Sequence, residues 1–214
     1  MLSFVSKTWV LFFGYAIICL GHGLQGTLVG VRAIIEDFSF LQTGIIITGY
    51  YVGYLSGSLI IPHFLKKVGH IRVFAALASL ASLAILLHSI FIIPIIWFFI
   101  RILTGISIAG IFVIMESWLN QKSTNSTRGS ILSIYMIITF SFLGLGSFLL
   151  NISDPAKYDL FILVSILLSF ALIPILLTST NAPNFENPKR IKFSELYQIS
   201  PLGFVGALLI GFSH

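Results

Sequence analysis

The stretch Val73–Met115 reads VFAALASLASLAILLHSIFIIPIIWFFIRILTGISIAGIFVIM and holds one charged residue, Arg101. An α-helix needs about 20 apolar residues to cross the roughly 30 Å of hydrocarbon in a bilayer. The stretch is therefore long enough for two crossings, and Ile93–Pro94 marks the turn between them. It predicts membrane-spanning helices at Val73–Ile92 and Ile95–Met115.

Charged residues bound the other apolar runs in the same way. They predict four more spans, at Trp9–Gly30, Leu41–Ile61, Ser130–Leu150 and Asp159–Leu177. We expect Pro62 to close the second span of the chain, and Pro174 to kink the sixth. The final run, Pro201–His214, is too short to cross the membrane at about 1.5 Å per residue, and we expect it to be a truncated seventh helix.

The composition excludes an ordinary soluble domain. Hydrophobic residues form 57% of the 214 residues and charged residues only 9%, against about 25% in soluble proteins. The mean hydropathy is +1.04 and the net charge is +5. The basic excess is too small and too dispersed to predict nucleic-acid binding. A single cysteine, Cys19, excludes an internal disulfide and any cysteine-rich metal site.

Basic residues are concentrated on one side of the predicted bundle. When the spans alternate in direction, nine Lys and Arg fall on one side and two on the other. The nine are Lys7, Lys66, Lys67, Arg72, Lys122, Arg128, Lys189, Arg190 and Lys192, and the two are Arg32 and Lys157. Cytoplasmic loops of membrane proteins carry such an excess, so the bias predicts a cytoplasmic N-terminus.

The predicted spans divide into two sets of three. This suits a 3+3 inverted repeat, although the residues show no convincing identity between the two sets. We expect a six-helix transmembrane bundle over residues 1–180, a cytoplasmic linker over 181–200, and the start of a seventh helix over 201–214.

A short segment between the second and third spans carries a family resemblance. Pro62–Arg72 reads PHFLKKVGHIR. It resembles the loop signature G-x-x-x-D-R-x-G-R-R of the major facilitator superfamily, which Gly69 and the flanking basic residues match. The segment departs from the signature at Pro62, where the first Gly belongs, and at Lys66, where the Asp belongs.

Other stretches extend the resemblance over essentially the whole chain. Arg101-x-x-x-Gly105 is similar to the arginine motif in the fourth helix of the same superfamily. Gly144–Gly146 lies in the fifth span, but the Gly-Pro pair of the superfamily's drug/proton antiporters is absent. Gly23–Leu28 and Glu116–Asn120 resemble a poorly characterised bacterial branch.

The resemblance implies an all-α integral membrane fold: six transmembrane helices in a 3+3 inverted repeat plus a truncated seventh, forming the N-terminal half of a 12-helix transporter. It also implies a central cavity lined by the first and fourth helices, but it supplies no substrate. The sequence itself shows no intramembrane nucleophile with a base, no paired carboxylates and no metal-ligand spacing. We therefore predict a protein that is not an enzyme and needs no cofactor or metal.

Arg101 is the most informative single residue. A charge at this depth costs at least about 2.5–3.5 kcal/mol, so such residues face the protein interior. With Cys19 and Gly105 as the centres of their helices, His22 and Arg101 lie at similar depth, about 4–6 Å outward of the midplane. No carboxylate shares that depth. The counter-charge is therefore expected to be an anionic substrate group or a carboxylate of a second half, and the structural alternative is an arginine bonded to backbone carbonyls and water.

Four other residues join Arg101 in the predicted substrate or ion pathway. His22 is a candidate carrier of a coupling proton, because an imidazole titrates near neutral pH. Gln25 and Thr27 lie one turn further out and are candidate substrate contacts. Tyr50, on the second helix, is within reach of the same cavity. Packing and helix–helix hydrogen bonds are the alternative roles for these four residues.

A charged cluster is expected at the basic end of the bundle. Glu116 is predicted to pair with Arg72 or Lys67 and, with Lys66 and Gly69, to form the loop signature and a cytoplasmic gate. A solvated helix end is the alternative for Glu116.

Glycines repeat every four residues along the second span. Gly49, Gly53 and Gly57, together with Gly105 of the fourth span, predict close helix packing, because small residues let backbones approach. The stripe either slides against a second half or makes a static contact within this one.

The leading function is secondary active transport of a small solute by alternating access, with proton coupling and an anionic substrate as open options. The alternatives are a membrane enzyme, a non-transporting remnant or scaffold, and a half-size subunit that needs a partner half. The expected partners are the lipid bilayer, a small-molecule substrate and a second six-helix half, and not nucleic acid. The expected location is a bacterial inner membrane, as a multi-pass protein.

Overall fold

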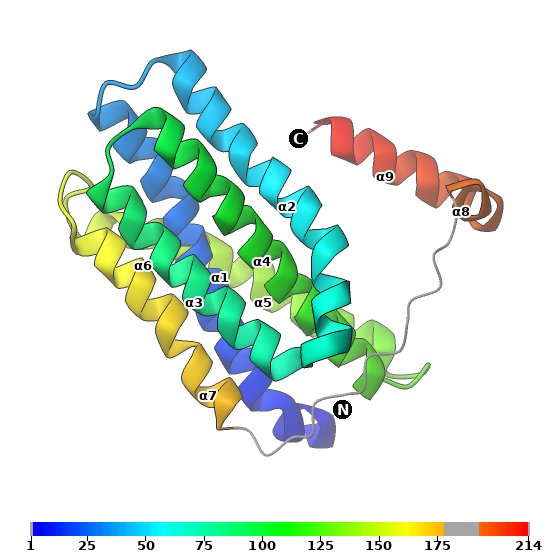
Figure 1. The fold of residues 1–214 in the computed structure, drawn as a ribbon. Coiled ribbons are helices and arrows are strands. Elements are labelled where there is room, and N and C mark those ends of the chain that lie inside the picture. The colour runs from blue at the N-terminus through cyan, green and yellow to red at the C-terminus, as the bar shows by residue number, and fades with distance from the viewer. Residues whose placement is uncertain (1, 178–192, 214) are drawn as a thin grey trace.

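Helices are the only regular elements in the residues that the structure describes, 2–177 and 193–213 (Figure 1). In this computed structural model, the first long helices are α1 (Leu2–Ile35), α2 (Phe40–Val68) and α3 (His70–Ile90). They are followed by α4 (Pro94–Lys122), α5 (Arg128–Phe148), the 3-10 turn η1 (Leu149–Ile152), α6 (Asp159–Phe170) and α7 (Leu172–Leu176). The last two are α8 (Phe193–Ile199) and α9 (Pro201–Ser213).

The six predicted membrane spans are confirmed. Six segments of the described chain are long and apolar enough to cross a bilayer, with mean hydropathies from 1.3 to 2.5. They are Trp9–Ile35, Phe40–Val68, His70–Ile90, Pro94–Lys122, Arg128–Ile152 and Asp159–Leu176. A helix satisfies its own backbone hydrogen bonds, which is what a segment surrounded by hydrocarbon requires.

The prediction that Pro62 ends the second span is wrong. α2 continues past Pro62 to Val68 and changes direction in its last turns (Figure 1). A proline removes one backbone hydrogen bond and crowds the preceding turn, which bends a helix without necessarily ending it. The helix ends instead at Gly69, whose φ of 89° is readily available only to glycine and whose N–H bonds the carbonyl of Leu65.

The segment expected to be a loop between the second and third spans is therefore mostly helical. Lys66 and Lys67 lie in the last turn of α2, and Arg72 lies in the first turn of α3. Gly69 alone separates the two helices.

The sixth span breaks close to its proline. α6 ends at Phe170 and α7 begins at Leu172, while Pro174 lies inside α7. The ring of Pro174 crowds the carbonyl of the residue four positions earlier, Phe170, which accounts for a break at Ala171.

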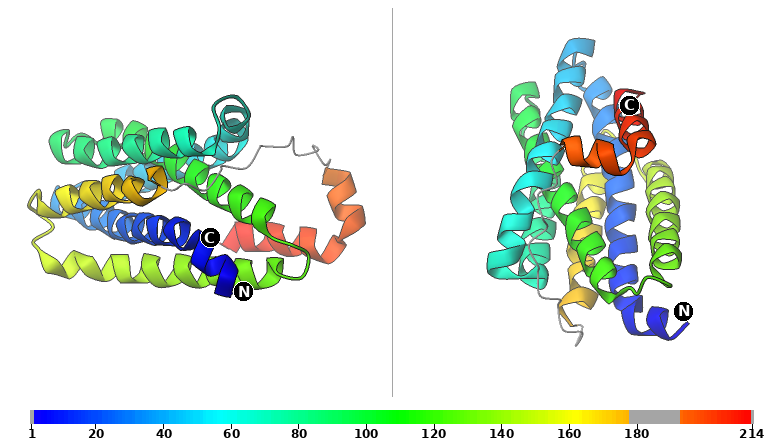
Figure 2. Two further views of the ribbon diagram at one scale, coloured as in Figure 1. Left: turned by 90° about the horizontal axis from the view of Figure 1, so that it is seen from below. Right: turned by 90° about the vertical axis from the view of Figure 1, so that its right-hand side faces the viewer.

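The predicted linker is partly helical. Residues 181–192 of it, with the basic residues Lys189, Arg190 and Lys192, lie outside the described residues, and so does His214. Of the rest, α8 forms the last part of the linker and packs on α9, to one side of the six-helix bundle (Figures 1 and 2).

The six spans pack as two interlocked triplets. α2 lies along α4, and α5 lies along α1; α3 packs on α4, α6 packs on α1, and α3 and α6 face each other (Figure 2). Exchanging α1 with α4, α2 with α5 and α3 with α6 leaves this pattern unchanged. Because each triplet has three spans, the second begins on the opposite side of the membrane. The packing is thus that of the predicted inverted repeat.

The backbones of α2 and α4 meet at two glycines. A Cβ atom on Gly53 would overlap the carbonyl oxygen of Ile102 in α4, and a Cβ atom on Gly105 would overlap the carbonyl oxygen of Tyr50 in α2. No larger residue fits at either position unless the two helices move apart.

Gly49 and Gly57 continue this contact along α2. A Cβ atom on Gly49 would lie 2.7 Å from the carbonyl oxygen of Phe98, and one on Gly57 would lie 2.8 Å from the Cα atom of Ile106. In this structure the glycine stripe is therefore a contact within the six-helix bundle.

The same reciprocal contact recurs between α1 and α5. A Cβ atom on Gly23 would overlap the carbonyl oxygen of Leu143, and one on Gly146 would overlap that of Leu20. On all four helices the glycine follows the contacted carbonyl by three residues: Leu20 and Gly23, Tyr50 and Gly53, Ile102 and Gly105, Leu143 and Gly146. This shared spacing gives the register of the internal repeat.

A methyl group at Gly53 should therefore weaken the bundle. We expect Gly53→Ala to lower the free energy of unfolding by about 1–3 kcal/mol, the usual cost of overpacking. Gly44→Ala is the matched control, because nothing lies within 4 Å of a Cβ atom there and alanine favours the same helix. Thermal unfolding of the two purified variants in detergent tests this, and equal midpoints would contradict the proposed close contact.

Candidate functional site

A cavity of about 580 Å³ lies between α1, α2, α4 and α5. All four helices contribute residues to its wall: His22, Gly23, Gly26, Thr27, Ile47, Tyr50, Tyr51, Arg101, Phe140, Leu143, Gly144 and Ser147. Most of the wall is apolar or backbone, and its polar side chains include Arg101, Tyr50 and His22. This is the composition expected of a site for a small molecule.

Two glycines make room for the cavity. Nothing lies within 4 Å of the position of a Cβ atom at Gly26 in α1 or at Gly144 in α5. These glycines are not held by packing, unlike Gly23 and Gly146 on the same two helices. The helix backbone itself is thus exposed to whatever fills the cavity.

Tyr50 connects the two predicted polar groups. Its hydroxyl lies 3.2 Å from Nε2 of His22, and the two rings are stacked with centroids 5.7 Å apart. The guanidinium carbon of Arg101 lies 4.7 Å from the centroid of the same tyrosine ring, in a cation–π contact. Three helices therefore contribute to one polar cluster at the cavity wall.

Arg101 is a buried cation with unused hydrogen-bond donors. It is only 7% exposed, and its Nε and Nη1 atoms have no hydrogen-bond partner. Among the described residues, the ion pair found within 4 Å joins Arg32 to Glu36, so no acid neutralises Arg101. A guanidinium in a medium of low dielectric constant attracts an anion strongly, because little solvent screens its charge.

The remaining two predicted residues differ in their position. Thr27 lines the cavity, but its hydroxyl donates to backbone carbonyls of its own helix, Gly23 at 3.2 Å and Leu24 at 3.0 Å. Gln25 is fully buried and does not line the cavity, so the structure does not bring it to the expected contact site. Both polar atoms of its amide lack a hydrogen-bond partner.

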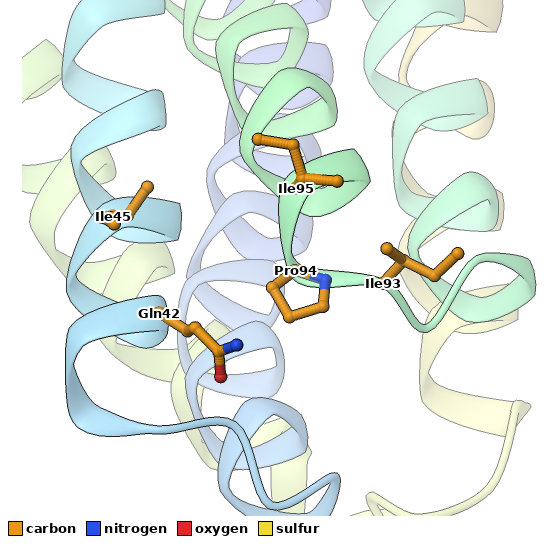
Figure 3. A pocket seen from close by; sticks show the side chains of 5 residues that line it. All are labelled: Gln42, Ile45, Ile93, Pro94 and Ile95. Carbon is orange, nitrogen blue, oxygen red and sulfur yellow. The ribbon is translucent and has the colours of Figure 1, made fainter.

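A second pocket, of about 340 Å³, lies near the ends of α2 and α4 and is mostly apolar (Figure 3). Its polar residue, Gln42, already caps α2: its side-chain oxygen accepts from the N–H of Ser39, and the hydroxyl of Ser39 accepts from the N–H of Gln42. The other lining residues are Ile45, Ile93, Pro94 and Ile95. This pocket therefore offers a ligand fewer polar groups than the cavity around Arg101 does.

Comparison with known proteins agrees with this architecture. The model of the Major Facilitator Superfamily matches residues 11–213. The chain belongs to this superfamily. With six spans, it is a multi-pass integral membrane protein.

The relatives of this superfamily chain are distant and longer. It is 24% identical, over 220 residues, to the uncharacterised MFS-type transporter YcaD of Escherichia coli strain K12. It is 25% identical over 220 residues to YcaD of Escherichia coli O6:K15:H31, strain 536. Each match covers 99% of this chain but only 56% of the relative, so the chain spans about half the length of the curated relatives it matches. No solved structure matches the chain.

An aromatic layer separates the cavity from the basic end of this superfamily bundle. Phe112 of α4 contacts His22 on one side, with ring centroids 6.3 Å apart, and Tyr15 on the other, at 5.9 Å. Tyr54 of α2 contacts Phe112 at 6.4 Å. Residues of α1, α2 and α4 thus form a floor beneath the polar cluster.

A chain of polar contacts lies below this floor. The hydroxyls of Tyr15 and Thr139 are 2.8 Å apart, and the rings of Tyr15 and Tyr135 stack with centroids at 4.9 Å. The hydroxyl of Tyr135 donates to Oε1 of Glu116 at 3.2 Å. These contacts join α1, α4 and α5 near the basic end.

The predicted charged gate is not assembled in this structure. Glu116 bonds Tyr135, and no ion pair joins it to Lys67 or Arg72 among the described residues. The side chains of Lys66, Lys67 and Arg72 are exposed around Gly69.

Sequence reasoning missed the contribution of α5. Phe140, Leu143, Gly144 and Ser147 form one wall of the cavity. Three of these are apolar or lack a side chain, so they resemble lipid-facing positions. The two glycines of Gly144–Gly146 were the available signal in the sequence, and only the structure shows that Gly146 packs on Leu20 whereas Gly144 borders the cavity.

Sequence reasoning also missed His88. Its Nδ1 lies 2.8 Å from the carbonyl oxygen of Ala84, its ring packs on Trp97 at 5.2 Å, and its Nε2 has no hydrogen-bond partner. His88 and Gln25 are thus two further buried polar groups that do not line the cavity.

The two contacts of Tyr50 can be separated by substitution. Tyr50→Phe keeps the ring next to Arg101 and removes the bond to His22, so we expect it to lower the free energy of unfolding by about 0.5–1.5 kcal/mol. Tyr50→Leu also removes the cation–π contact, for a further loss of about 2 kcal/mol. Tyr51→Phe, on the same wall, serves as the control, because Tyr51 contacts the ring of Tyr50 but the hydrogen bond to His22 and the cation–π contact belong to Tyr50. Chemical unfolding in detergent measures all three, and equal losses for Tyr50→Phe and Tyr50→Leu would show that the ring does not stabilise Arg101.

Proposed function

We propose that this chain forms the N-terminal half of a secondary transporter that moves a small solute by alternating access. The observation that carries the proposal is Arg101, a buried and uncompensated cation in the wall of a cavity of about 580 Å³. Membership of a superfamily of transporters supports the same function. The greater length of the YcaD relatives supports a second half that completes the cavity.

The distribution of charge supports a cytoplasmic N-terminus in a bacterial inner membrane. The basic end of the bundle exposes Lys66, Lys67 and Arg72. At the other end, Arg32 is neutralised by Glu36, with Nη2 and Oε1 2.5 Å apart. An excess of Lys and Arg in the loops, whether or not they form ion pairs, marks the cytoplasmic side of a membrane protein.

We propose that the substrate carries an anionic group. The planar guanidinium of Arg101 lines the cavity, which suits a carboxylate or phosphate, and its Nε and Nη1 atoms have no hydrogen-bond partner within the protein. The apolar remainder of the wall, including Ile47 and Phe140, would contact the rest of the molecule. A carboxylate of the second half is the alternative counter-charge for Arg101.

His22 is the proposed site of proton coupling. A proton on its imidazole would place a second positive charge beside Arg101, because Tyr50 contacts both side chains. Two cations repel each other and attract an anion more strongly than one does. Protonation of His22 and binding of an anionic substrate would therefore favour each other, which is the linkage that a proton-coupled symporter needs.

The aromatic floor is the proposed barrier on the cytoplasmic side. Phe112 and Tyr15 lie between His22 and the basic end, and the bond between Tyr135 and Glu116 lies below them. In an alternating-access cycle, these contacts would break when the cavity opens toward the cytoplasm.

A second half would make the native protein larger than this chain. An antibody raised against the Asn181–Ser200 segment should detect, in native membranes, a polypeptide of about twice 23.6 kDa, because the relatives carry nearly as much chain again. Mass spectrometry of the captured species gives its intact mass. A species of 23.6 kDa would favour the alternatives, a non-transporting remnant or a subunit that requires a partner half.

The proposed substrate and its proton coupling can be tested together by a transport assay. The complete protein, reconstituted in proteoliposomes, should accumulate at least one member of a panel of radiolabelled organic anions when a pH gradient is imposed. Arg101→Gln should reduce that uptake by about tenfold or more, because charged hydrogen bonds contribute about 1.5–3 kcal/mol. His22→Gln should abolish the response to the pH gradient but leave exchange of the anion.

The controls for this assay are variants outside the cavity and solutes without charge. Arg128→Gln removes a basic residue at the start of α5, away from the cavity wall, and should leave uptake unchanged. Uptake confined to neutral or cationic solutes, with Arg101→Gln as active as the unaltered protein, would refute the anionic substrate.

A further inference from the structure

A groove of about 340 Å³ separates α2 from α3 near the basic end of the bundle. α2 and α3 each pack on α4 and touch each other little beyond the turn at Gly69. Ile106 of α4 forms part of the groove's lining between them. The groove does not share a residue with the cavity around Arg101.

The groove is apolar except at one place. Its lining from α2 consists of Ile60, Ile61, Phe64 and Val68. α3 contributes Val73, Ala76 and Leu77 together with Arg72, which is the charged residue of the groove. From Ile60 to Val68 the wall rises about 12 Å along the helix, at about 1.5 Å per residue. An apolar channel of this length, with a guanidinium at one end, matches a hydrocarbon chain that ends in an anion.

The basic end of the groove carries uncompensated positive charge. The side chain of Arg72 is exposed, and so are those of Lys66 and Lys67 in the last turn of the neighbouring helix. None of these three residues takes part in an ion pair within the described part of the chain. Positive charge at the end of an apolar surface that faces the bilayer attracts the phosphate of a lipid.

The shape of the groove follows from residue size. Ala76 faces outward on α3 and has only a methyl group, whereas Phe64 and Ile60 of α2 project beside it. A larger residue at position 76 would occupy the channel without altering any charge. The lipid-facing stripe of α3 thus contains a short gap directly inward of Arg72, one turn along the helix.

We propose that this groove binds one anionic phospholipid, with the phosphate on Arg72 and part of an acyl chain between α2 and α3. A soluble anion would gain nothing from the apolar lining, and a zwitterionic lipid would present a cation to Arg72, Lys66 and Lys67 as well as a phosphate. The inference requires that the chain lies in a membrane and that the groove faces lipid and not the proposed second half, and it is independent of the transport activity and of the identity of the transported solute.

The test compares lipids on the purified protein. Native mass spectrometry should show phosphatidylglycerol bound more tightly than phosphatidylcholine of the same chain length. Arg72→Gln should weaken phosphatidylglycerol binding by about fivefold, the factor expected for one basic residue at the membrane surface. Arg128→Gln removes a basic residue of the same end that does not line the groove, and should leave the affinity unchanged.

A second pair of variants tests the acyl chain. Ala76→Phe should weaken binding of phosphatidylglycerol although it preserves every charge, and Ala76→Ser should not. Thermal unfolding without lipid establishes that each variant is folded.

Three results would overturn the proposal. Equal losses for Arg72→Gln and Arg128→Gln would indicate diffuse attraction to the basic end instead of a site. Competition by glycerol phosphate at the affinity of the lipid would indicate a site for a soluble anion. Full binding by Ala76→Phe, with the protein folded, would show that no chain enters the groove.

Discussion

The close approach of α2 to α4, and of α1 to α5, is the constraint on which the rest of the bundle depends. Helices in lipid gain little from the hydrophobic effect when they associate, so close backbone packing has to hold them together. Gly53 and Gly105 supply it on one side of the bundle, and Gly23 and Gly146 supply it on the other. The two close pairs leave α1 and α4 in the interior, and the cavity lies where the pairs face each other.

Much of this fold could be predicted from the spacing of charged residues. Charges are expensive in hydrocarbon, so their absence locates each span, and the six spans are indeed present. The positions of the charges do not predict the residue at which each helix ends. Pro62 was expected to stop α2, yet the helix bends and continues to Val68, because a proline removes one backbone hydrogen bond without necessarily ending the helix. Comparison of residue identities also did not reveal the repeat. The two triplets share instead a spacing, in which the packed glycine follows the contacted carbonyl by three residues.

The sequence predicted how deep each residue of the candidate site lies in the membrane, but not the face of the helix on which it lies. A rise of about 1.5 Å per residue placed His22 and Arg101 at one level, and the structure brings both against Tyr50. Depth says nothing about the face on which a residue lies. At about 100° per residue, the wall residues of α1 cover an arc of about 140° from His22 to Thr27, and Gln25 lies about 60° outside that arc on the His22 side, so it is buried beside the cavity instead of within it. The face of α1 that borders the cavity depends on which helices α1 packs against.

The contrast between two arginines bears on the role of Arg101. Arg32 is 6% exposed and Arg101 is 7% exposed, so both guanidinium groups lose most of their hydration. Arg32 is compensated: it pairs with Glu36, donates to the carbonyls of Pro155 and Ala156, and lies 5.9 Å from the ring of Phe161. The structural role considered for Arg101, bonding to backbone carbonyls, is thus realised at Arg32. At Arg101 the Nε and Nη1 atoms have no partner and the side chain lines the cavity, so the burial of this cation costs free energy that an anionic partner would offset.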